Sequence, residues 1–104
     1  MRFLWEILVP ATKKDGTPYS IFYHRTWDKR VRDICGGLSI CPVINGQWIN
    51  HEGILFSEKM IPVRIACSRN EIESVIDMTI DYYEQEAVMA YKVSEEVIIK
   101  YADK

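Results

Sequence analysis

Residues 36–48 read Gly-Gly-Leu-Ser-Ile-Cys-Pro-Val-Ile-Asn-Gly-Gln-Trp, and this stretch decides the fold that the sequence predicts. Gly36 and Gly37 mark the end of a helix, because glycine readily adopts the left-handed conformation that closes one. Residues 38–44 then alternate as a strand, and Pro42 indicates an edge or a bulge there because proline cannot donate to a ladder. Asn45-Gly46 predicts a tight hairpin turn before a short returning strand over 47–49.

Upstream of this stretch, the pattern predicts a strand followed by a helix. Apolar residues alternate over 3–9, as in a strand, and the run ends at Pro10. After a turn, apolar residues recur at helical spacing up to Ile34, with Thr17 as the expected cap and Pro18 as the first helical residue. The first helix is therefore expected over about residues 18–34.

Downstream, the pattern predicts a long strand, a second helix and two terminal strands. The long strand covers 54–67, where Pro62 again suggests an edge or a break. Asn70 is expected to cap the second helix, with Glu73 completing a capping box. Strands over 88–93 and 97–101 follow, joined by a turn at 94–96, as a terminal hairpin or one bent strand.

This order, β-α-β-β-α-β with an added hairpin and terminal strand, predicts a single ferredoxin-like α+β domain over residues 1–104. Two helices cover one face of an antiparallel sheet in this arrangement. The terminal strands carry apolar residues on both faces, so the uncovered face is also expected to be apolar. Because large exposed apolar surfaces usually mark interfaces, we expect a homodimer.

The chain also resembles a small, uncharacterised bacterial and phage family known only as a domain of unknown function. The resemblance spans about residues 4–101 and rests on a Gly-Gly-Leu-Ser motif, a Gly-x-Trp motif and a Tyr-x-x-Gln-Glu-x-Val motif. The matching positions here are Gly36, Gly37, Leu38, Ser39, Gly46, Trp48, Tyr82, Gln85, Glu86 and Val88. The resemblance implies a ferredoxin-like fold and no established activity.

The net charge and its distribution along the chain limit the kinds of ligand that the protein could bind. The net charge of −2 over 104 residues argues against a general nucleic-acid binder. Charge is uneven, since residues 1–34 hold seven bases and four acids while residues 35–104 hold six bases and eleven acids. The basic segment and the acidic segment could attract each other within the fold or across a dimer, or their electric field could steer a charged ligand toward the protein.

The three cysteines and the apolar segments point to a cytoplasmic protein. Cys35, Cys41 and Cys67 have no metal-type spacing and are expected to be inert buried thiols in a reducing compartment. The amino terminus lacks the features of a signal peptide, and no apolar run is long enough to span a membrane.

Six residues are the candidates for ligand binding. Arg64 interrupts an apolar strand and is expected to point away from the helices, where an anion or a partner's acid could meet it. Trp48 either presents its ring to a ligand or fills the base of the hairpin. His24 and Arg25 form a basic cluster on the first helix, which is either an anion site or a solvated helix face. Tyr82 and Tyr91 could line a cleft or the open sheet face, or pack across it.

The remaining polar groups form no recognisable site. His51 and Glu52 lie in the same predicted turn, which we expect to be an ordinary surface turn. No second histidine or cysteine lies at the spacing that a metal site would need. No nucleophile-base set and no phosphate-binding glycine loop occurs. We therefore predict no catalytic residue, no metal and no cofactor.

Three functions remain open from the sequence. The first is a non-enzymatic module that sequesters or senses an anionic small molecule such as a nucleotide. The second is a protein-interaction or inhibitor module that docks through the acidic second helix or an edge at Pro42 and Pro62. The third is a cofactor-free dimeric α+β-barrel enzyme with His24 or a tyrosine as base, which would need an apolar pocket holding a polar histidine.

Overall fold

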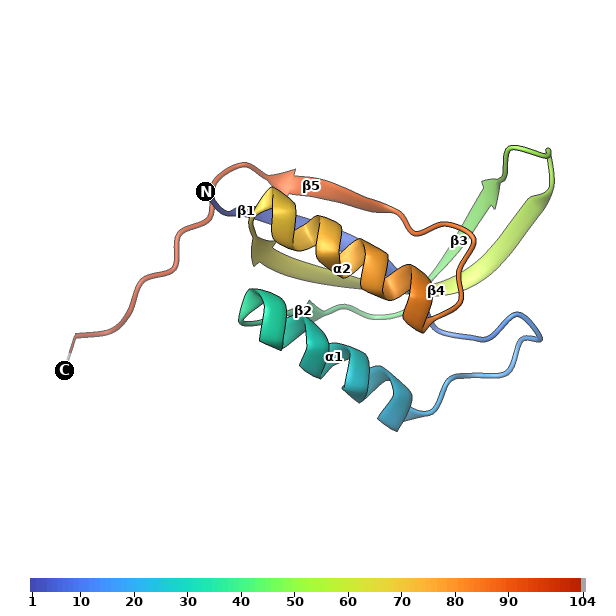
Figure 1. Ribbon diagram of the computed structural model, residues 1–104, viewed down its shortest axis with the longest axis horizontal. Helices are drawn as coiled ribbons and strands as arrows, with labels where there is room; N and C mark the ends of the chain where they lie inside the picture. Colours follow the sequence, from blue (N-terminus) through green and yellow to red (C-terminus); the bar gives the residue numbers. More distant parts are fainter. Residues whose placement is uncertain (104) are drawn as a thin grey trace.

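The computed structural model describes residues 1–103 and contains one five-stranded antiparallel sheet with two helices packed on the same face (Figure 1). The strands are β1 (Phe3–Pro10), β2 (Ser39–Ile40), β3 (Ile44–Ile49), β4 (Leu55–Cys67) and β5 (Ala90–Ser94). The helices are α1 (Ile21–Cys35) and α2 (Arg69–Tyr82). The predicted ferredoxin-like α+β fold is confirmed.

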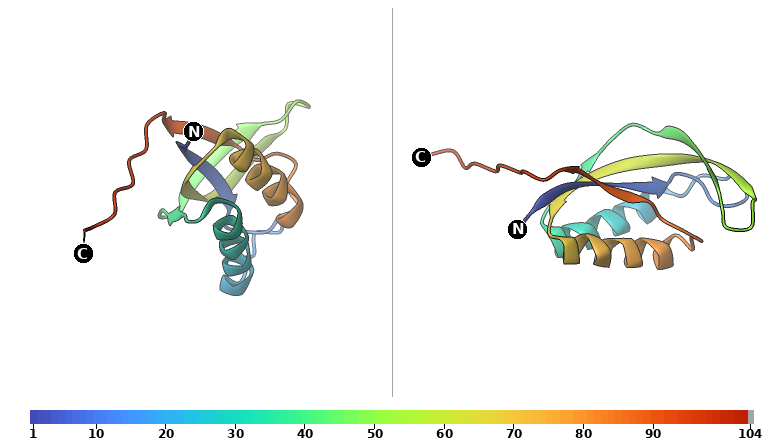
Figure 2. Two further views of the ribbon diagram at one scale, coloured as in Figure 1. Left: turned by 60° about the vertical axis from the view of Figure 1, so that its left-hand side comes forward. Right: turned by 90° about the horizontal axis from the view of Figure 1, so that it is seen from above.

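The strands lie in the order β2-β4-β1-β5, and β3 also pairs with β4. Strand β4 is long enough to pair with both β1 and β3. Its second half pairs with β1, and its first half pairs with β3. The β3–β4 hairpin therefore projects beyond the rest of the sheet and curls toward the helix side (Figure 2). This projection creates the candidate site described below.

The core lies between the helices and the odd-numbered residues of β1 and β4. Ile7, Val63 and Ile65 are buried on the sheet side, and Trp27 and Val75 are buried on the helix side. Alternation of period two in the strands and a repeat near 3.6 in the helices bring these side chains to one interface. The sequence pattern predicted this layer directly.

Both helix starts differ from the prediction. Ser20, not Thr17, caps α1 by accepting a hydrogen bond from the Tyr23 amide, because the Thr17 amide and hydroxyl are bound to Asp15. In α2 the capping box joins Ser68 and Glu71, ahead of the predicted Asn70 and Glu73. The end of α1 is as expected, with Gly36 at a φ of 94°.

The predicted turn at Asn45-Gly46 is wrong. Pairing runs without interruption from Ile44 opposite Met60 to Ile49 opposite Leu55, and the turn lies at residues 50–53 instead. A Cβ atom at Gly46 would meet the terminal methyl group of Met60, so this flexible side chain would have to move. Tertiary packing therefore overrides the local turn preference.

The two prolines behave differently from each other. Pro42 lies in the break between β2 and β3, at an edge of the sheet as predicted. Pro62 lies inside β4 without breaking it, which corrects the prediction of an edge or a break. The Pro62 carbonyl accepts a hydrogen bond from the Cys41 amide, so the Pro62 nitrogen faces the same edge of β4. Residues 41–43, which lie along this edge, belong to no strand, so the lack of an N–H group on Pro62 removes no hydrogen bond from a strand pair.

The predicted terminal hairpin is also wrong, because no strand covers 97–101 in the described chain. The C-terminal arm, which we define as residues 95–103, extends away from the domain (Figure 1).

The centre of the uncovered sheet face is polar rather than apolar. Arg64 Nε donates to Glu6 Oε1 at 3.0 Å, and the Tyr91 hydroxyl donates to the other oxygen of the same carboxylate. These three residues are neighbours on adjacent strands, since Glu6 pairs with both of the others. The expected apolar face, and with it the original reason for a homodimer, is therefore not found there.

The cysteines provide a prediction about chemical reactivity. Cys35 and Cys67 are buried, whereas Cys41 is half-buried, which corrects the expectation that all three are buried. Burial and the neighbouring Cys35 thiol raise the pKa of Cys67 to about 12, and burial also raises the pKa of Cys35. Because the thiolate is the reactive form, iodoacetamide should modify only Cys41 in the folded protein.

Intact-mass spectrometry checks this pattern. We expect one adduct under native conditions, three in denaturant, and none in native Cys41→Ser. A second adduct on the folded wild type would contradict the burial of Cys35 and Cys67.

Candidate functional site

A cleft of about 510 Å³ lies between the β3–β4 hairpin and the segment that joins α2 to β5. We call it the hairpin cleft. Most of its lining is apolar, and its polar side chains are few, as is usual for small-molecule sites. Its lining residues are Leu8, Pro10, Ile44, Gly46, Gln47, Trp48, Glu58, Met60, Gln85, Ala87, Val88 and Met89.

The aromatic and acidic groups of the hairpin cleft are held in fixed positions. The ring of Trp48 stacks on Phe56 with a centroid distance of 4.7 Å and an interplanar angle of 15°. Its Nε1 donates to Glu58 Oε1 at 2.8 Å. The other carboxylate oxygen of Glu58 makes no hydrogen bond within residues 1–103, so it is available to a ligand.

The opposite wall comes from the loop after α2. The Gln85 side chain donates to the Tyr83 carbonyl at 3.0 Å, and Leu8 N donates to the Met89 carbonyl at 3.0 Å. These bonds hold residues 85–89 against the end of β1, facing the hairpin. Among the lining residues, Glu58 is the one ionisable group, so the hairpin cleft is weakly acidic.

Asn50 ties the hairpin turn to this loop. Its Oδ1 accepts from the amides of Glu52 at 2.9 Å and Ile54 at 3.0 Å, which forms the turn. Its Nδ2 donates to Glu86 Oε1 at 3.2 Å, which joins two segments that are distant in the sequence. Only 9% of Asn50 is exposed. This contact connects the hairpin turn to the loop that forms the opposite wall of the hairpin cleft.

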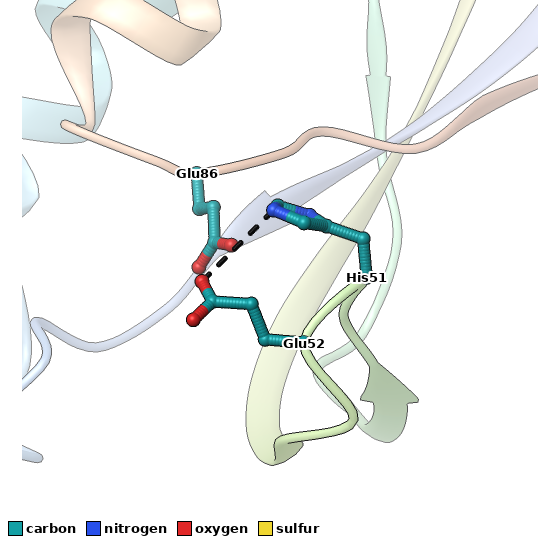
Figure 3. Close-up of side chains that lie close together, drawn as sticks. All are labelled: His51, Glu52 and Glu86. Atoms are coloured by element: carbon teal, nitrogen blue, oxygen red, sulfur yellow. Dashed lines mark ion pairs between the residues drawn. The ribbon is translucent and has the colours of Figure 1, made fainter.

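The same contact brings His51, Glu52 and Glu86 together (Figure 3). One donor atom from each lies within 4.8 Å of the others, and His51 Nε2 is 3.9 Å from Glu52 Oε1. An imidazole and two carboxylates are donors that Zn²⁺ accepts, although all three side chains are exposed here. Local sequence patterns do not predict this set, because Glu86 lies in a different loop from His51 and Glu52.

Arg64, the leading candidate from the sequence, already has a partner. It points to the uncovered face as predicted, but the carboxylate that meets it is Glu6 of the same chain. Hydrogen bonding to Glu6 and its negative charge raise the pKa of Arg64. Tyr91 joins the same network. Only Nε of Arg64 is engaged in this way, but the Glu6 carboxylate beside it offsets the charge that would attract an anion.

His24 and Arg25 line a second cavity of about 280 Å³ between α1 and the sheet, which we call the α1 cavity. His24 Nδ1 and the Tyr83 hydroxyl lie 2.6 Å apart and share a hydrogen bond. Burial raises the pKa of Tyr83, so the phenol stays neutral. Asp28 also lines the α1 cavity, and burial raises the pKa of its carboxyl. The enzyme hypothesis requires an apolar pocket with a polar histidine, but at about 280 Å³ the α1 cavity falls below the roughly 300–1,000 Å³ range of small-molecule sites.

Tyr82 lies outside the hairpin cleft and the α1 cavity, and it lines instead a shallow, mostly polar depression of about 640 Å³ at the end of α2, together with Tyr23 and Arg30. Its ring stacks on Tyr23 with a centroid distance of 4.2 Å, and its hydroxyl donates to the Tyr23 carbonyl at 2.8 Å. The Arg30 guanidinium lies 4.7 Å from the centre of its ring. These contacts fasten the end of α2 to the start of α1, so Tyr82 has a packing role in the structure.

The environment of His24 predicts how stability depends on pH. Burial lowers the pKa of His24 in the folded protein below its ordinary value of 6.5. The unfolded chain therefore binds a proton more readily, and stability should fall as the pH drops below about 6.5. The raised pKa of Asp28 acts in the opposite sense, at more acidic pH.

Urea denaturation between about pH 7.5 and 5 measures this effect. His24→Gln keeps a polar group near Tyr83 but cannot titrate in this range, so its stability should vary less with pH. An equally steep decline in the variant would show that another group is responsible.

The structure thus separates the six sequence candidates. Trp48 belongs to the hairpin cleft, and His24 and Arg25 belong to the α1 cavity. Arg64 and Tyr91 form the polar network of the uncovered face with Glu6, and Tyr82 packs against Tyr23 between the two helices. Sequence reasoning missed Glu58, Met60 and the 85–89 loop, because nothing local indicates that the hairpin faces that loop.

No protein-family model and no curated protein sequence matches the chain. Within residues 1–103, no helix is long and apolar enough to cross a membrane. The family resemblance seen in the sequence is thus supported for the ferredoxin-like fold that it implies, and not for membership.

Solved structures share the fold across nearly the whole chain. A phage SAM lyase in complex with S-methyl-5′-thioadenosine has a TM-score of 0.67 at 16% identity, covering 94% of this chain and 93% of that one. The periplasmic divalent cation tolerance protein CutA from Archaeoglobus fulgidus has a TM-score of 0.66 at 13% identity, covering 96% and 89%. The divalent cation tolerance protein from Thermus thermophilus has a TM-score of 0.62 at 13% identity, covering 93% and 88%. At these identities the likeness establishes the α+β fold alone.

Proposed function

We propose that the protein is a non-enzymatic module that binds a small planar molecule, neutral or cationic, in the hairpin cleft. The observation that carries this proposal is the position of Trp48 beside Glu58 in a mostly apolar cleft of about 510 Å³. That volume lies within the roughly 300–1,000 Å³ range of small-ligand sites.

Each wall of the hairpin cleft suits one part of a nucleoside thioether. A planar base can stack on Trp48, as bases do on aromatic side chains. The free oxygen of Glu58 can accept from ribose hydroxyls or an amino group. Met60, Leu8 and Met89 provide apolar contacts for an alkylthio group. The phage SAM lyase, solved in complex with S-methyl-5′-thioadenosine, supports this ligand class.

The charges favour a ligand different from the anionic one expected from the sequence. Glu58 lines the hairpin cleft, and Glu52 and Glu86 lie beside its outer end. A phosphate would be repelled by these carboxylates, whereas a neutral nucleoside or a sulfonium cation would not. Arg64, the expected anion-binding group, is paired with Glu6.

Isothermal titration calorimetry with a charge series tests this proposal. We expect S-methyl-5′-thioadenosine, adenosine and S-adenosylmethionine to bind, and AMP and ATP to bind progressively more weakly. Tighter binding of ATP, or no binding by any member, would contradict the proposal. Chromatography of S-adenosylmethionine after incubation tests the non-enzymatic part, because its consumption would mean that the protein is an enzyme.

A second candidate function is binding of a divalent cation by His51, Glu52 and Glu86. The convergence of their donor atoms within 4.8 Å favours it, and two of the similar structures are divalent cation tolerance proteins. Titration with Co²⁺, followed by its visible absorption, should show saturable binding that His51→Ala abolishes. Glu95→Gln, an exposed change outside the set, serves as the control. Equal binding by both variants would exclude this site.

A further inference from the structure

The C-terminal arm, residues 95–103, has the sequence of a strand but no strand partner. Val97, Ile98 and Ile99 are β-branched, a residue type enriched in strands. Within the described chain, no hydrogen bond satisfies the backbone of residues 97–103. Ile98 is 79% exposed and Tyr101 is 86% exposed. An extended apolar segment in this state is a template for pairing with another chain.

A matching unpaired edge lies on the β3–β4 hairpin. Pairing between β1 and β4 ends at Met60, so residues Leu55–Glu58 pair only with β3 among the described strands. Ile49 and Leu55, which pair with each other near the turn, are 66% and 60% exposed. The hairpin therefore presents both free backbone groups and uncovered apolar side chains.

The backbone geometry identifies which groups are free. The Lys59 carbonyl accepts from the Ala11 amide, so the backbone groups of Lys59 face the β1 side of the strand. Residues two apart in a strand direct their backbone groups to the same side. The N–H and C=O of Ser57 therefore face the edge where β1 has ended, and they can accept an additional strand.

The arm and the hairpin lie at opposite ends of the molecule (Figures 1 and 2). A contact between these two surfaces on different copies joins them head to tail. Repetition of such a contact closes into a ring when the rotation allows it. The second copy of the chain is the partner that carries the complementary surface.

We propose that the arm of one copy pairs as a strand with the Leu55–Glu58 edge of β4 in a second copy. Because Glu58 also lines the hairpin cleft, the neighbouring arm then forms an added wall beside that cleft. The pairing uses backbone groups at the edge and buries the exposed apolar side chains of both surfaces. It does not require the uncovered sheet face, where Glu6, Arg64 and Tyr91 lie.

Two proline variants of the full chain test the proposal through its backbone hydrogen bonds. Ile99→Pro removes a donor from the arm, and Ser57→Pro removes a donor from the free edge without removing a β3–β4 hydrogen bond. The matched controls are Ile99→Val and Ser57→Thr, which keep the N–H group. Far-UV circular dichroism establishes that each variant is folded.

Sedimentation equilibrium without ligand should give a mass above one chain for the wild type and both controls. Each proline variant alone should have the mass of one chain. An equimolar mixture of the two should form a species of two chains, because one intact arm then meets one intact edge. A monomeric wild type, unchanged mass in a folded proline variant, or no association in the mixture would overturn the proposal.

Hydrogen exchange gives a second measurement that does not depend on the variants. In the wild type, amides 97–101 should be protected at high protein concentration and should lose that protection on dilution. Protection that is independent of concentration would mean that the arm folds back on its own chain, which would also overturn the proposal. Both measurements are made without ligand, so failure of the proposed nucleoside binding would leave them unaffected.

Discussion

Trp27→Ala is expected to be the most destabilising single substitution considered for this protein. Trp27 is 1% exposed in the centre of the helix–sheet interface. Removal of a buried tryptophan side chain costs about 3–5 kcal/mol, through lost burial and the cavity left behind. Since domains of this size are stable by only about 5–15 kcal/mol, the variant should be close to unfolding.

A polar contact adds to this loss. Trp27 Nε1 donates to Thr79 Oγ1 at 2.9 Å, and both groups are buried. Thr79→Val keeps the shape of the side chain but leaves the indole N–H without a partner, which should cost about 1–3 kcal/mol. Comparison of the two variants separates the hydrogen bond from the packing.

Thermal denaturation measures both effects. Trp27→Ala should lower the melting temperature by on the order of 20 °C. Trp48→Ala is the matched control, because this tryptophan is half-buried on the hairpin and lies outside the core. Similar losses for the two tryptophans would contradict the assignment of the core to the helix–sheet interface.

Trp48→Ala is expected to have the largest effect on ligand binding. Loss of stacking between a base and an aromatic ring costs about 1–3 kcal/mol, or roughly 5- to 150-fold in the dissociation constant. Trp48→Phe keeps an aromatic surface but loses the hydrogen bond to Glu58. It should therefore retain most of the affinity for S-methyl-5′-thioadenosine.

Calorimetry on the folded variants checks this order of affinities. Phe22→Ala removes an aromatic residue that is 73% exposed on α1, and it should leave binding unchanged. Unaltered affinity in Trp48→Ala would place the ligand outside the hairpin cleft. Equal losses in Trp48→Ala and Phe22→Ala would indicate a nonspecific effect on the protein.

Local signals in the sequence predicted the elements, but their ends depended on competing contacts. Thr17 and Asn70 are both acceptable helix caps, yet Asp15 engages Thr17, and Ser68 forms the capping box of α2 instead. Asn45-Gly46 is a strong turn signal, but the cross-strand register of β3 and β4 places it inside a strand. At the helix starts the competing contacts are local, within three residues in the sequence, whereas at Asn45-Gly46 the pairing of β3 with β4 decides the outcome.

The candidate site was even less accessible to sequence reasoning. Trp48 was identified because tryptophan is enriched at binding hot spots and this one lies in a predicted hairpin. The partners of Trp48 could not be identified in this way. A turn at Asn45-Gly46 would have given β3 a different register with β4, so it would not have placed Glu58 beside Trp48. Residues 85–89 face the hairpin only after the whole sheet has formed.

By itself, the sequence determined the order of strands and helices, the buried face of each and the α+β class. These follow from the hydrophobic period, which is local and needs no partner to be read. Tertiary structure alone decided that Arg64 meets Glu6, that Trp48 faces the loop after α2, and that the C-terminal arm stays unpaired within its own chain. Pairing between distant segments depends on register and on the twist of the sheet, which local patterns do not specify.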